Sequence, residues 1–350
     1  MKKKIVSVYS LIHFIVDLAS ITCVLNLVKA YSPNLNNSIM ILTVIIYNFC
    51  GFALQMPIGA IADKLNKNAL VSASGCIFVL IGYIFFKNPI FAAILSGIGN
   101  SLFHVGGGID VLNISDKKAT LSGIYVSTGA LGVFLGTKSL SWGFNKYWIM
   151  ILLLVFAFFL LLKLYNDIKG TVSNVPVKLD NLNINAYIAI ACIFITVALR
   201  SYVGMILSFE WKQNLILAFA SIFAVIFGKM LGGIIGDKIG FEKISISLII
   251  SAICFIFAFD NPIFGIIAIL LFNMTMPITL TCLSNILENN KGLAFGLLTV
   301  ALFVGYLPFQ FGILGAFTKI GLFCLTVLSS LILFIALINY NKVIKIREEN

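Results

Sequence analysis

The sequence predicts an all-α polytopic membrane protein of about twelve transmembrane helices, arranged as two pseudo-symmetric six-helix bundles. Composition, a series of long apolar runs and a repeat between the two halves of the chain predict this fold. Of the 350 residues, 60% are hydrophobic and only 11% are charged, and the mean hydropathy is +1.07. A soluble domain of this length needs more surface charge and cannot bury so much apolar area. A lipid bilayer must therefore cover most of the chain.

Twelve apolar runs approach or exceed the roughly 20 residues that a helix needs to cross a bilayer. They span residues 5–28, 38–62, 69–86, 89–112, 119–138, 147–165, 186–208, 213–236, 244–260, 262–286, 292–311 and 319–340. The boundary near Pro308 to Lys319 is the least defined, so eleven helices are the alternative. The first run follows three lysines, as a signal peptide would, but it is too long for one, and we expect it to remain as the first helix.

Lysine and arginine residues are distributed unevenly between the two sides of the predicted membrane. With the N-terminus in the cytoplasm, the cytoplasmic side receives 16 of them and the opposite side 6, while Arg200 and Lys229 lie within helices. This positive-inside distribution predicts a multi-pass protein of the cell membrane with both termini in the cytoplasm. Because the lysines form short clusters between apolar runs, they argue against nucleic acid as the partner of this chain of net charge +11.

The longest polar interruption, residues 166–185, divides the chain into halves of similar length. We expect an N-terminal six-helix bundle at 1–165, a cytoplasmic linker at 166–185 and a C-terminal six-helix bundle at 186–350.

The two halves share three local patterns at an offset of 173–174 residues. The segment QMPIGAIADKLNKN at the end of the second run is matched by KMLGGIIGDKIGFEK at the end of the eighth. Asn100, which begins NSLFH, is matched by Asn273, which begins NMTMP, and Gly123 is matched by Gly296. Three matches in the same order indicate internal duplication, which is frequent in transporter folds.

The two matched loops resemble the G-x-x-x-D-[RK]-x-[GN] signature of the major facilitator superfamily. Its residues here are Gly59, Asp63 and Lys64 in the first copy and Gly233, Asp237 and Lys238 in the second. The resemblance implies a secondary transporter in which these loops act as a cytoplasmic gate. The aspartate would accept hydrogen bonds from backbone N–H groups at the start of a neighbouring helix, where the helix dipole favours an anion. The alternative is a helix stop followed by ordinary positive-inside lysines.

Three further segments are similar to elements of fosmidomycin-resistance-type exporters. HFIVD resembles their His-x-x-x-Asp element, GIGNSLFHVGGG their Phe-His element and STGALGVFLG their Gly-x-x-Leu-Gly element. Val105 and Gly106 stand where that group has Pro-Glu, and Thr137 stands where it has proline. This resemblance implies drug or antibiotic efflux by proton antiport. The glycines of the fifth helix suit either close helix packing or a seam that flexes.

Five ionisable residues lie within the apolar runs, where a charge costs about 2.5–3.5 kcal/mol. They are His13, Asp17, His104, Arg200 and Lys229. The superfamily resemblance implies that helices one, four, seven and ten line a central cavity, and the first three of these helices carry His13, Asp17, His104 and Arg200. His13 and Asp17 are four residues apart and share a helix face. Because imidazole titrates near neutrality and a buried carboxylate responds to a nearby cation, we expect Asp17, His13 and His104 to couple transport to protons. A static polar pair is the alternative. Two His and one Asp are also possible metal ligands, but their spacing is not diagnostic and we expect no metal.

Arg200 and Lys229 favour an anionic or zwitterionic solute, since arginine in particular suits carboxylate or phosphate groups. The alternatives are an ion pair of Arg200 with Asp17 or Glu210, and a Lys229 that snorkels to the membrane surface. Asn100 precedes His104 by one helical turn and is expected to orient it. Further polar or stacking contacts to the solute are expected from Gln55, Asn100, Asn48, Tyr47, Asn273, Trp142 and Gln310.

These observations predict a proton-coupled secondary transporter that moves a small organic solute by alternating access. No phosphate-binding loop of the G-x-x-x-x-G-K-[ST] type is present, so any driving force for transport must come from an ion gradient. We expect a monomer without a cofactor and without enzymatic activity. The alternatives are drug efflux by proton antiport, a facilitated-diffusion carrier, a solute sensor that keeps the transporter fold and, from another class, a polytopic membrane enzyme that uses the histidines and Asp17.

Overall fold

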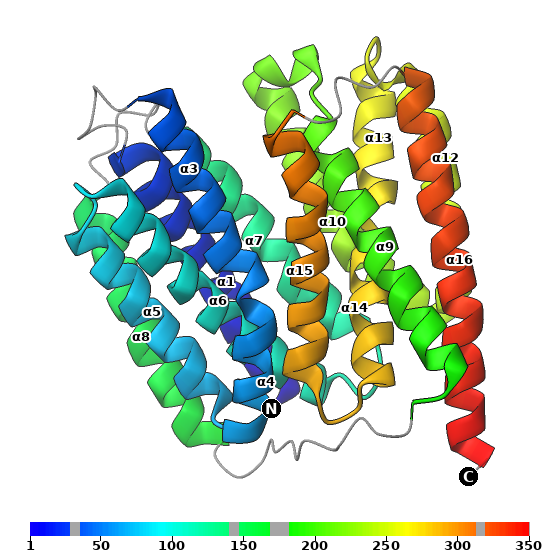
Figure 1. Ribbon diagram of the computed structural model, residues 1–350, viewed down its shortest axis with the longest axis horizontal. Helices are drawn as coiled ribbons and strands as arrows, with labels where there is room; N and C mark the ends of the chain where they lie inside the picture. Colours follow the sequence, from blue (N-terminus) through cyan, green and yellow to red (C-terminus); the bar gives the residue numbers. More distant parts are fainter. Residues whose placement is uncertain (29–35, 140–146, 169–181, 313–318, 350) are drawn as a thin grey trace. The chain divides into compact units, whose positions relative to one another are not determined.

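The computed structural model describes residues 1–28, 36–139, 147–168, 182–312 and 319–349, whose regular secondary structure is helical throughout (Figure 1). The contacts within the chain group these helices into two compact units. Unit 1 comprises Met1–Ile114, Thr128–Pro176 and Asn289–Val300, and unit 2 comprises Ser115–Ser127, Val177–Glu288 and Ala301–Asn350. Residues 169–181 of the predicted linker lie outside the described part, and the division at 166–185 stays a prediction.

Unit 1 is built mainly from the first half of the chain. Its helices are α1 (Lys2–Ile21), the π-helical η1 (Thr22–Leu27), α3 (Asn37–Asn48), the π-helical η2 (Phe49–Ala53), α4 (Gln55–Leu65), α5 (Asn68–Ile84), α6 (Pro89–Ile114) and α8 (Tyr147–Ile168). Helices α5 and α6 approach closely at Gly75 and Gly99, where a Cβ on either glycine would lie 2.5–2.6 Å from the carbonyl oxygen of the other. Small residues at such a crossing let two backbones pack without a hydrophobic driving force in lipid.

Unit 2 is built mainly from the second half. Its helices are α9 (Ile184–Ile206), the 3-10 turn η3 (Glu210–Gln213), α10 (Leu215–Ile239), α11 (Phe241–Ile244), α12 (Ile246–Ala258), α13 (Pro262–Asn273), α14 (Thr275–Ile286) and α16 (Lys319–Glu349). Two helices contribute to both units. The first residues of α7 (Thr120–Lys138), up to Ser127, belong to unit 2, and the first residues of α15 (Lys291–Gln310), up to Val300, belong to unit 1.

Eleven helices of the described residues are long and apolar enough to cross a membrane, and α5, with 17 residues, is a shorter apolar helix. The predicted all-α polytopic membrane fold of about twelve helices is therefore confirmed. Residues 313–318, where the sequence leaves the last boundary least defined, lie outside the described residues.

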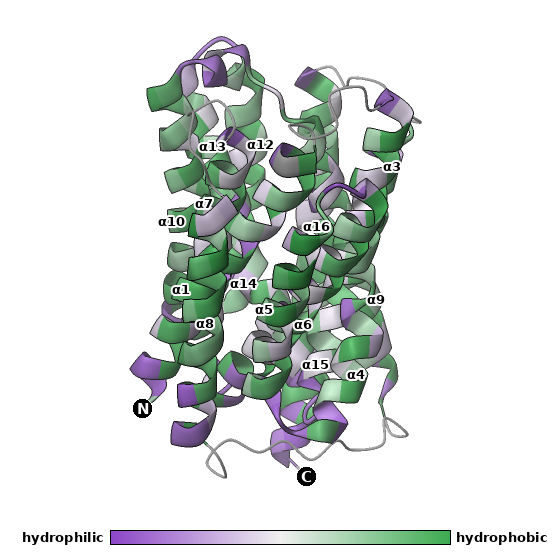
Figure 2. Ribbon diagram, turned by 90° about the vertical axis from the view of Figure 1, so that its left-hand side faces the viewer, coloured by the Kyte–Doolittle hydropathy of each residue, from purple (hydrophilic) through white to green (hydrophobic). Residues whose placement is uncertain are grey.

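Large apolar side chains cover the outward faces of the helices, as contact with lipid requires. On α8, Trp148, Leu152, Phe156 and Phe159 recur at helical spacing and are 52–67% exposed. Hydrophilic residues concentrate near the helix ends and the connecting segments, while the helices themselves are hydrophobic over most of their length (Figure 2). A helix that exposes this much apolar surface is stable only where the surroundings are apolar.

Helices α4 and α10 end at equivalent positions of the repeat. Asn66 follows α4 with a φ of 52°, and Gly240 follows α10 with a φ of 96°. Both values are positive, a region that glycine adopts freely and asparagine tolerates better than other residues with a Cβ. The alternation of Gly and Asn at the last position of the loop signature thus follows from backbone geometry.

This geometry predicts the effect of substitutions at Asn66. Asn66→Gly should leave the stability of the folded protein unchanged or slightly raised, whereas Asn66→Val should lower it by about 1–2 kcal/mol, because a β-branched side chain is strained at positive φ. Thermal unfolding of the purified variants in one detergent checks this prediction. Equal unfolding temperatures for the two variants would contradict it.

Candidate functional site: a buried His-Asp-His cluster

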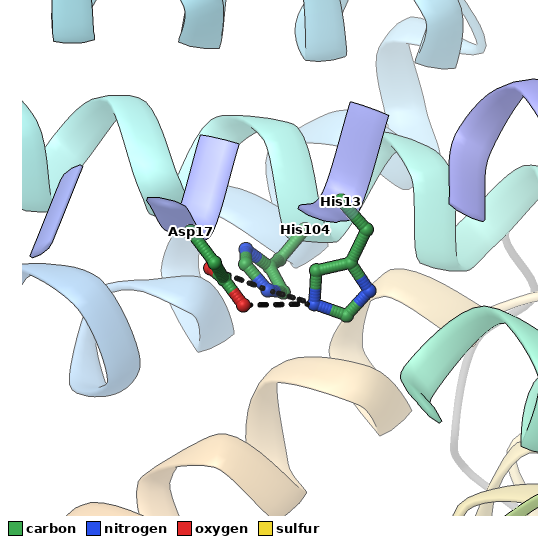
Figure 3. Close-up of side chains that lie close together, drawn as sticks. All are labelled: His13, Asp17 and His104. Atoms are coloured by element: carbon green, nitrogen blue, oxygen red, sulfur yellow. Dashed lines mark hydrogen bonds and ion pairs between the residues drawn. The ribbon is translucent and has the colours of Figure 1, made fainter. Parts of the chain in front are cut away.

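Three ionisable side chains of unit 1 converge inside the membrane-spanning helices. His13 and Asp17 lie one turn apart on α1, and His104 reaches them from α6 (Figure 3). The Nε2 atom of His13 lies 3.2 Å from Asp17 Oδ2, and the Nε2 atom of His104 lies 3.6 Å from Asp17 Oδ1. The two Nε2 atoms are 2.8 Å apart. The structure therefore brings together the three side chains that the sequence predicts as a proton-coupling group.

Asn100 holds this cluster from one turn earlier on α6. Its side-chain amide donates to Asp17 Oδ1 at 2.8 Å, and its backbone carbonyl lies 2.8 Å from Nδ1 of His104. Because a carbonyl oxygen only accepts, Nδ1 of His104 must carry the proton in that contact. The Nε2 atom of a neutral His104 then presents a lone pair to His13, whose Nε2 proton has two acceptors within reach, His104 and Asp17. The side chain of Asn100 thus binds Asp17 while its backbone contacts His104, and the orienting role of Asn100 stays a prediction.

The cluster has more acceptor atoms than protons when both histidines are neutral. Adding one proton converts an imidazole into an imidazolium beside the carboxylate, which neutralises the net charge of the group. Asp17 is 7% exposed and His13 is 5% exposed, so little solvent screens these charges. In such surroundings the interaction between a buried charge and its partner is strong. The arrangement is suited to holding one proton in more than one position.

Gly129 of α7 leaves the space that the cluster occupies. A Cβ at this position would overlap both His13 Nε2 and Asp17 Oδ2, and a Cβ at Gly132 would meet the α1 backbone at Leu18. Gly136 likewise packs against Ile21. These three glycines of the fifth apolar run therefore pack α7 tightly onto α1, and only Gly129 touches the ionisable atoms.

The three ligand-type atoms of His13, Asp17 and His104 lie within 4.8 Å of one another, a separation at which they could also hold a metal ion. Two histidine nitrogens and one carboxylate oxygen form a donor set typical of zinc and of other divalent transition metals.

Arg200 is the buried cation of unit 2. It lies on α9 with 8% exposure, its guanidinium is 5.4 Å from the centre of the Phe272 ring, and its Nε atom has no hydrogen-bond partner among the described residues. A buried arginine N–H without an acceptor is costly, since the charge and the donor both lose water. The side chain can therefore offer a donor to an anionic group that enters unit 2.

Lys229 and Asn273, the other residues of unit 2 predicted to bind the solute, already have partners. The ammonium group of Lys229 donates to the carbonyl of Val126 at 3.1 Å. The side-chain amide of Asn273 donates to the carbonyl of Ile269, one turn earlier on its own helix, at 2.8 Å. Lys229 thus ties α10 to the start of α7 within unit 2.

The remaining solute-binding predictions are dispersed. Asn48 and Gln55 donate to carbonyls of their own helical segments, those of Val44 and Gly51. Tyr47 belongs to a small apolar cluster with Val24 and Ala93. Gln310 accepts a hydrogen bond from the Tyr306 hydroxyl at 2.6 Å. Trp142 lies outside the described residues.

The two loop aspartates each bind the start of a helix within their own unit. Asp63 accepts from the backbone N–H groups of Gly292 and Leu293, at 2.8 and 3.0 Å, at the first turn of α15. A Cβ on Gly59 would overlap the backbone of Gly292, so glycine is required for this close approach. We call this region, defined by Asp63, Gly292 and Leu293, the Asp63 end of unit 1.

The second copy repeats these contacts. Asp237 accepts from the backbone N–H groups of Ala119 and Thr120, both at 2.8 Å, and from the Thr120 hydroxyl. A Cβ on Gly233 would overlap the carbonyl of Ala119. The positive end of a helix dipole and its free N–H groups favour a carboxylate at both places. The adjacent lysines, Lys64 and Lys238, are exposed.

Sequence reasoning missed one buried carboxylate. Asp110 on α6 is 2% exposed and accepts hydrogen bonds from Tyr9 and Asn68. It lies two residues before the predicted end of its apolar run. At such a position an acidic residue is readily interpreted as part of the solvent-exposed helix end. The cost of a charge in an apolar run, which singles out Asp17, applies equally to Asp110.

Comparison with solved structures shows the fold of the chain. The human organic anion transporter MFSD10 (TETRAN) is 13% identical with a TM-score of 0.71, and the match covers 96% of this chain and 99% of that one. The E. coli fucose:proton symporter FucP is 9% identical with a TM-score of 0.66 over 96% and 97% of the two chains. A bacterial homologue of the iron transporter ferroportin, in an outward-facing state, is 13% identical with a TM-score of 0.66 over 97% and 98%.

These proteins are major facilitator superfamily transporters, so the chain has the fold that its loops and repeat predict. At these levels of identity the likeness concerns the fold. Comparison of the sequence with protein-family models and with curated proteins gives no match. The resemblance to fosmidomycin-resistance-type exporters stays a prediction.

The contact of Gly129 with the cluster predicts that the stability of the protein depends on the absence of a side chain at this position. Gly129→Ala should destabilise the protein by about 1–3 kcal/mol, because the added methyl group must displace His13 or Asp17 in a packed site. Gly204→Ala on α9 is the matched control, since a Cβ there meets nothing within 4 Å. Thermal unfolding of both variants in the same detergent measures the difference. An equal response of the two variants would show that Gly129 does not form the wall of the cluster.

The two aspartate contacts predict local changes in hydrogen exchange. In Asp63→Asn, the amides of Gly292 and Leu293 should exchange faster, by a factor that corresponds to about 0.5–2 kcal/mol, because the amide side chain replaces one acceptor oxygen by a donor. In Asp237→Asn, the amides of Ala119 and Thr120 should respond instead. Mass-resolved exchange on peptides that cover both helix starts measures this, and unchanged protection in both variants would refute the role of the aspartates.

Proposed function

We propose that this chain, which has the major facilitator fold, is a secondary transporter of the cell membrane that moves a small organic solute by alternating access. Both termini are placed in the cytoplasm, as the lysine and arginine distribution favours. The transported solute is anionic or zwitterionic, and its movement is coupled to protons that bind at His13, Asp17 and His104. The observation that carries the proposal is the convergence of these three ionisable groups, nearly buried, within membrane-spanning helices.

The coupling step is a proton transfer within the cluster. A proton that arrives on Nε2 of His104 or on Nδ1 of His13, the ring nitrogens that carry none in the neutral state, produces an imidazolium, which pairs with the Asp17 carboxylate. Loss of this proton leaves neutral imidazole and an uncompensated carboxylate in an apolar helix, a charge that the protein tolerates only with good hydrogen bonds. Asn100 provides one of these bonds. If the two conformations bind this proton with different affinity, its binding and loss shift the equilibrium between them.

The negative charge on the solute is inferred from Arg200. Its planar guanidinium suits two parallel hydrogen bonds to a carboxylate or phosphate, and its Nε donor is the atom that lacks a partner among the described residues. Two of the similar structures are consistent with such a function in this fold, since one is described as an organic anion transporter and another as a fucose:proton symporter.

Gating is assigned to the loop residues Gly59, Asp63 and Lys64 and to their repeat equivalents Gly233, Asp237 and Lys238. Each aspartate accepts hydrogen bonds from two backbone amides at a helix start. Because both bonds of a pair go to one carboxylate, they can break and re-form together. We expect Asp63→Asn to weaken this closure and to shift the population toward the inward-open state.

The first experiment finds a solute and then tests the coupling. Thermal-shift screening of the purified protein with small carboxylates, phosphonates and antibiotics at several pH values selects a transported compound for proteoliposomes. Uptake driven by an imposed pH gradient should fall to background in Asp17→Asn, because the carboxylate that pairs with the imidazolium is lost. Arg200→Gln should weaken binding of the same compound, while Asp167→Asn, which removes an exposed carboxylate beside Lys4, should behave as the unmodified protein.

Transport that ignores the pH gradient and is unchanged in Asp17→Asn would contradict the proposal and support facilitated diffusion. Chemical turnover of the compound, lost in the same variant, would support the polytopic enzyme instead.

A divalent metal ion is the second candidate occupant of the cluster. The two histidine Nε2 atoms are 2.8 Å apart, and they lie 3.2 and 3.6 Å from different oxygens of Asp17. These distances lie around the value of about 3.3 Å that bond lengths of 2.0–2.1 Å give between ligands of a tetrahedral zinc ion. One similar structure is a homologue of an iron transporter. Binding of Co²⁺ to the purified protein, followed by its visible absorption and lost in His13→Ala and His104→Ala, would favour a metal over the proton.

A further inference from the structure

A second buried carboxylate lies on the same pair of helices as the cluster. Asp110 of α6 accepts a hydrogen bond from the hydroxyl of Tyr9 on α1 at 2.6 Å and another from the side-chain amide of Asn68, the first residue of α5, at 2.8 Å. All three side chains are at most 4% exposed. The proposed proton coupling does not use Asp110, and the loop signature does not include it.

The partners of Asp110 can satisfy the side chain with or without a proton. As a carboxylate, it accepts from Tyr9 and Asn68, two uncharged groups that fill acceptor positions without neutralising the charge. As a carboxylic acid, it needs an acceptor for its own O–H, and the Oδ1 atom of Asn68 is a buried acceptor without a hydrogen-bond partner among the described residues. Rotation of the Asn68 amide would present this oxygen, since the two ends of an amide differ only in donor and acceptor character. A buried carboxyl group with such partners has two donors as a carboxylate and an acceptor for its own proton as a carboxylic acid.

Asp110 lies between the cluster and the Asp63 end of unit 1. It follows His104 by six residues on α6, which is a rise of about 9 Å. On α1, Tyr9 precedes His13 by four residues and therefore lies on the same face, one turn closer to that end. The ring of Phe103 packs between these levels, with its centre 6.5 Å from that of Tyr9 and 6.1 Å from that of His13.

The residues of α6 beside Asp110 contact the first turns of α15. A Cβ on Gly108 would lie 2.6 Å from the Phe295 ring, and the ammonium group of Lys291 donates to the carbonyl of Leu112 at 3.2 Å. Among the described residues, Tyr9 on α1 is the ionisable group that contacts Asp110, Lys291 on α15 binds the backbone of α6 two residues further on, and His104 lies earlier on α6. Asp63 on α4 is engaged by the N–H groups of Gly292 and Leu293.

We propose that Asp110 is a second proton-binding side chain of unit 1, which exchanges protons between the His-Asp-His cluster and the Asp63 end. The proposal rests on the proton coupling proposed for the cluster. In the transfer, an imidazolium of His13 or His104 loses its N–H proton and becomes neutral imidazole, and the Asp110 carboxylate gains that proton and becomes a carboxylic acid. Proton and charge balance, and no oxidant or reductant takes part.

Infrared difference spectroscopy of the purified protein in lipid nanodiscs tests this assignment. Spectra recorded between acidic and alkaline buffers, within the range where the protein stays folded, should contain the carbonyl band of one buried carboxylic acid, Asp110, and the ring bands of the imidazolium that forms in the cluster. Asp110→Asn should remove the carbonyl band. Asp17→Asn should remove the imidazolium bands, because the imidazolium then lacks its carboxylate partner, and the double variant should lack both sets. Asp167→Asn, the exposed control, should keep both.

Tyr9→Phe provides a second test that keeps the carboxyl group and the aromatic ring. It removes one hydrogen bond to Asp110, so the carbonyl band of Asp110 should move to higher frequency while the imidazolium bands of the cluster stay in place. This variant decides the question even if Asp110→Asn does not fold.

An Asp110→Asn spectrum identical with that of the unmodified protein, or, where that variant does not fold, a Tyr9→Phe spectrum with no band displaced, would overturn the proposal. Loss of the carbonyl band in Asp110→Asn without any change of the imidazolium bands in Asp17→Asn would instead refute the proton role of the cluster and leave Asp110 as the proton-binding group. The failure of either assignment is therefore visible separately.

Discussion

A polar or ionised group inside an apolar helix is stable only where another part of the protein reaches it, because lipid offers no hydrogen bonds. This constraint explains where the polar residues of the two units lie. Asp17 is held by two histidines and an asparagine, and Asp110 by a tyrosine and an asparagine. Lys229 reaches a carbonyl of a neighbouring helix. Arg200 departs from the pattern through its Nε, which lacks a partner among the described residues, and this is why it is assigned to a solute.

The internal repeat of the sequence is matched by equivalent hydrogen bonds and packing contacts in the two units. Asp63 binds the amides of residues 292 and 293, and Asp237 binds those of 119 and 120, so that both the donors and the acceptors follow the offset of 173–174 residues. Gly296 packs against the carbonyl of Gln55 and Gly123 against that of Lys229, which again are equivalent pairs. In each unit a helix that starts at the loop aspartate is thus positioned by the same two devices, a carboxylate at its N-terminus and a glycine against the partner backbone.

The local features of the site follow from the sequence, whereas its long-range contacts do not. The pairing of His13 with Asp17 is predicted by their spacing of four residues, and the loop signature predicts an aspartate at a helix start. The contact of His104 with this pair depends on which helices are neighbours, which only the superfamily resemblance suggests. The identity of the bound helix start, residues 291–293 for Asp63, depends on packing between helices more than 200 residues apart. The energetic cost of a charge inside an apolar run applies to Asp110 as it does to Asp17. Its position near the end of the run, however, is typical of an exposed helix-end residue.

Calorimetry measures directly whether binding of the solute and protonation of the cluster are linked. Titration of the protein with the solute in buffers of different ionisation enthalpy gives the number of protons exchanged per solute molecule. We expect proton exchange in the unmodified protein and its loss in a folded Asp17→Asn variant that still binds the solute. Binding heats that are independent of the buffer in both proteins, or a proton exchange that Asp17→Asn leaves unchanged, would contradict it.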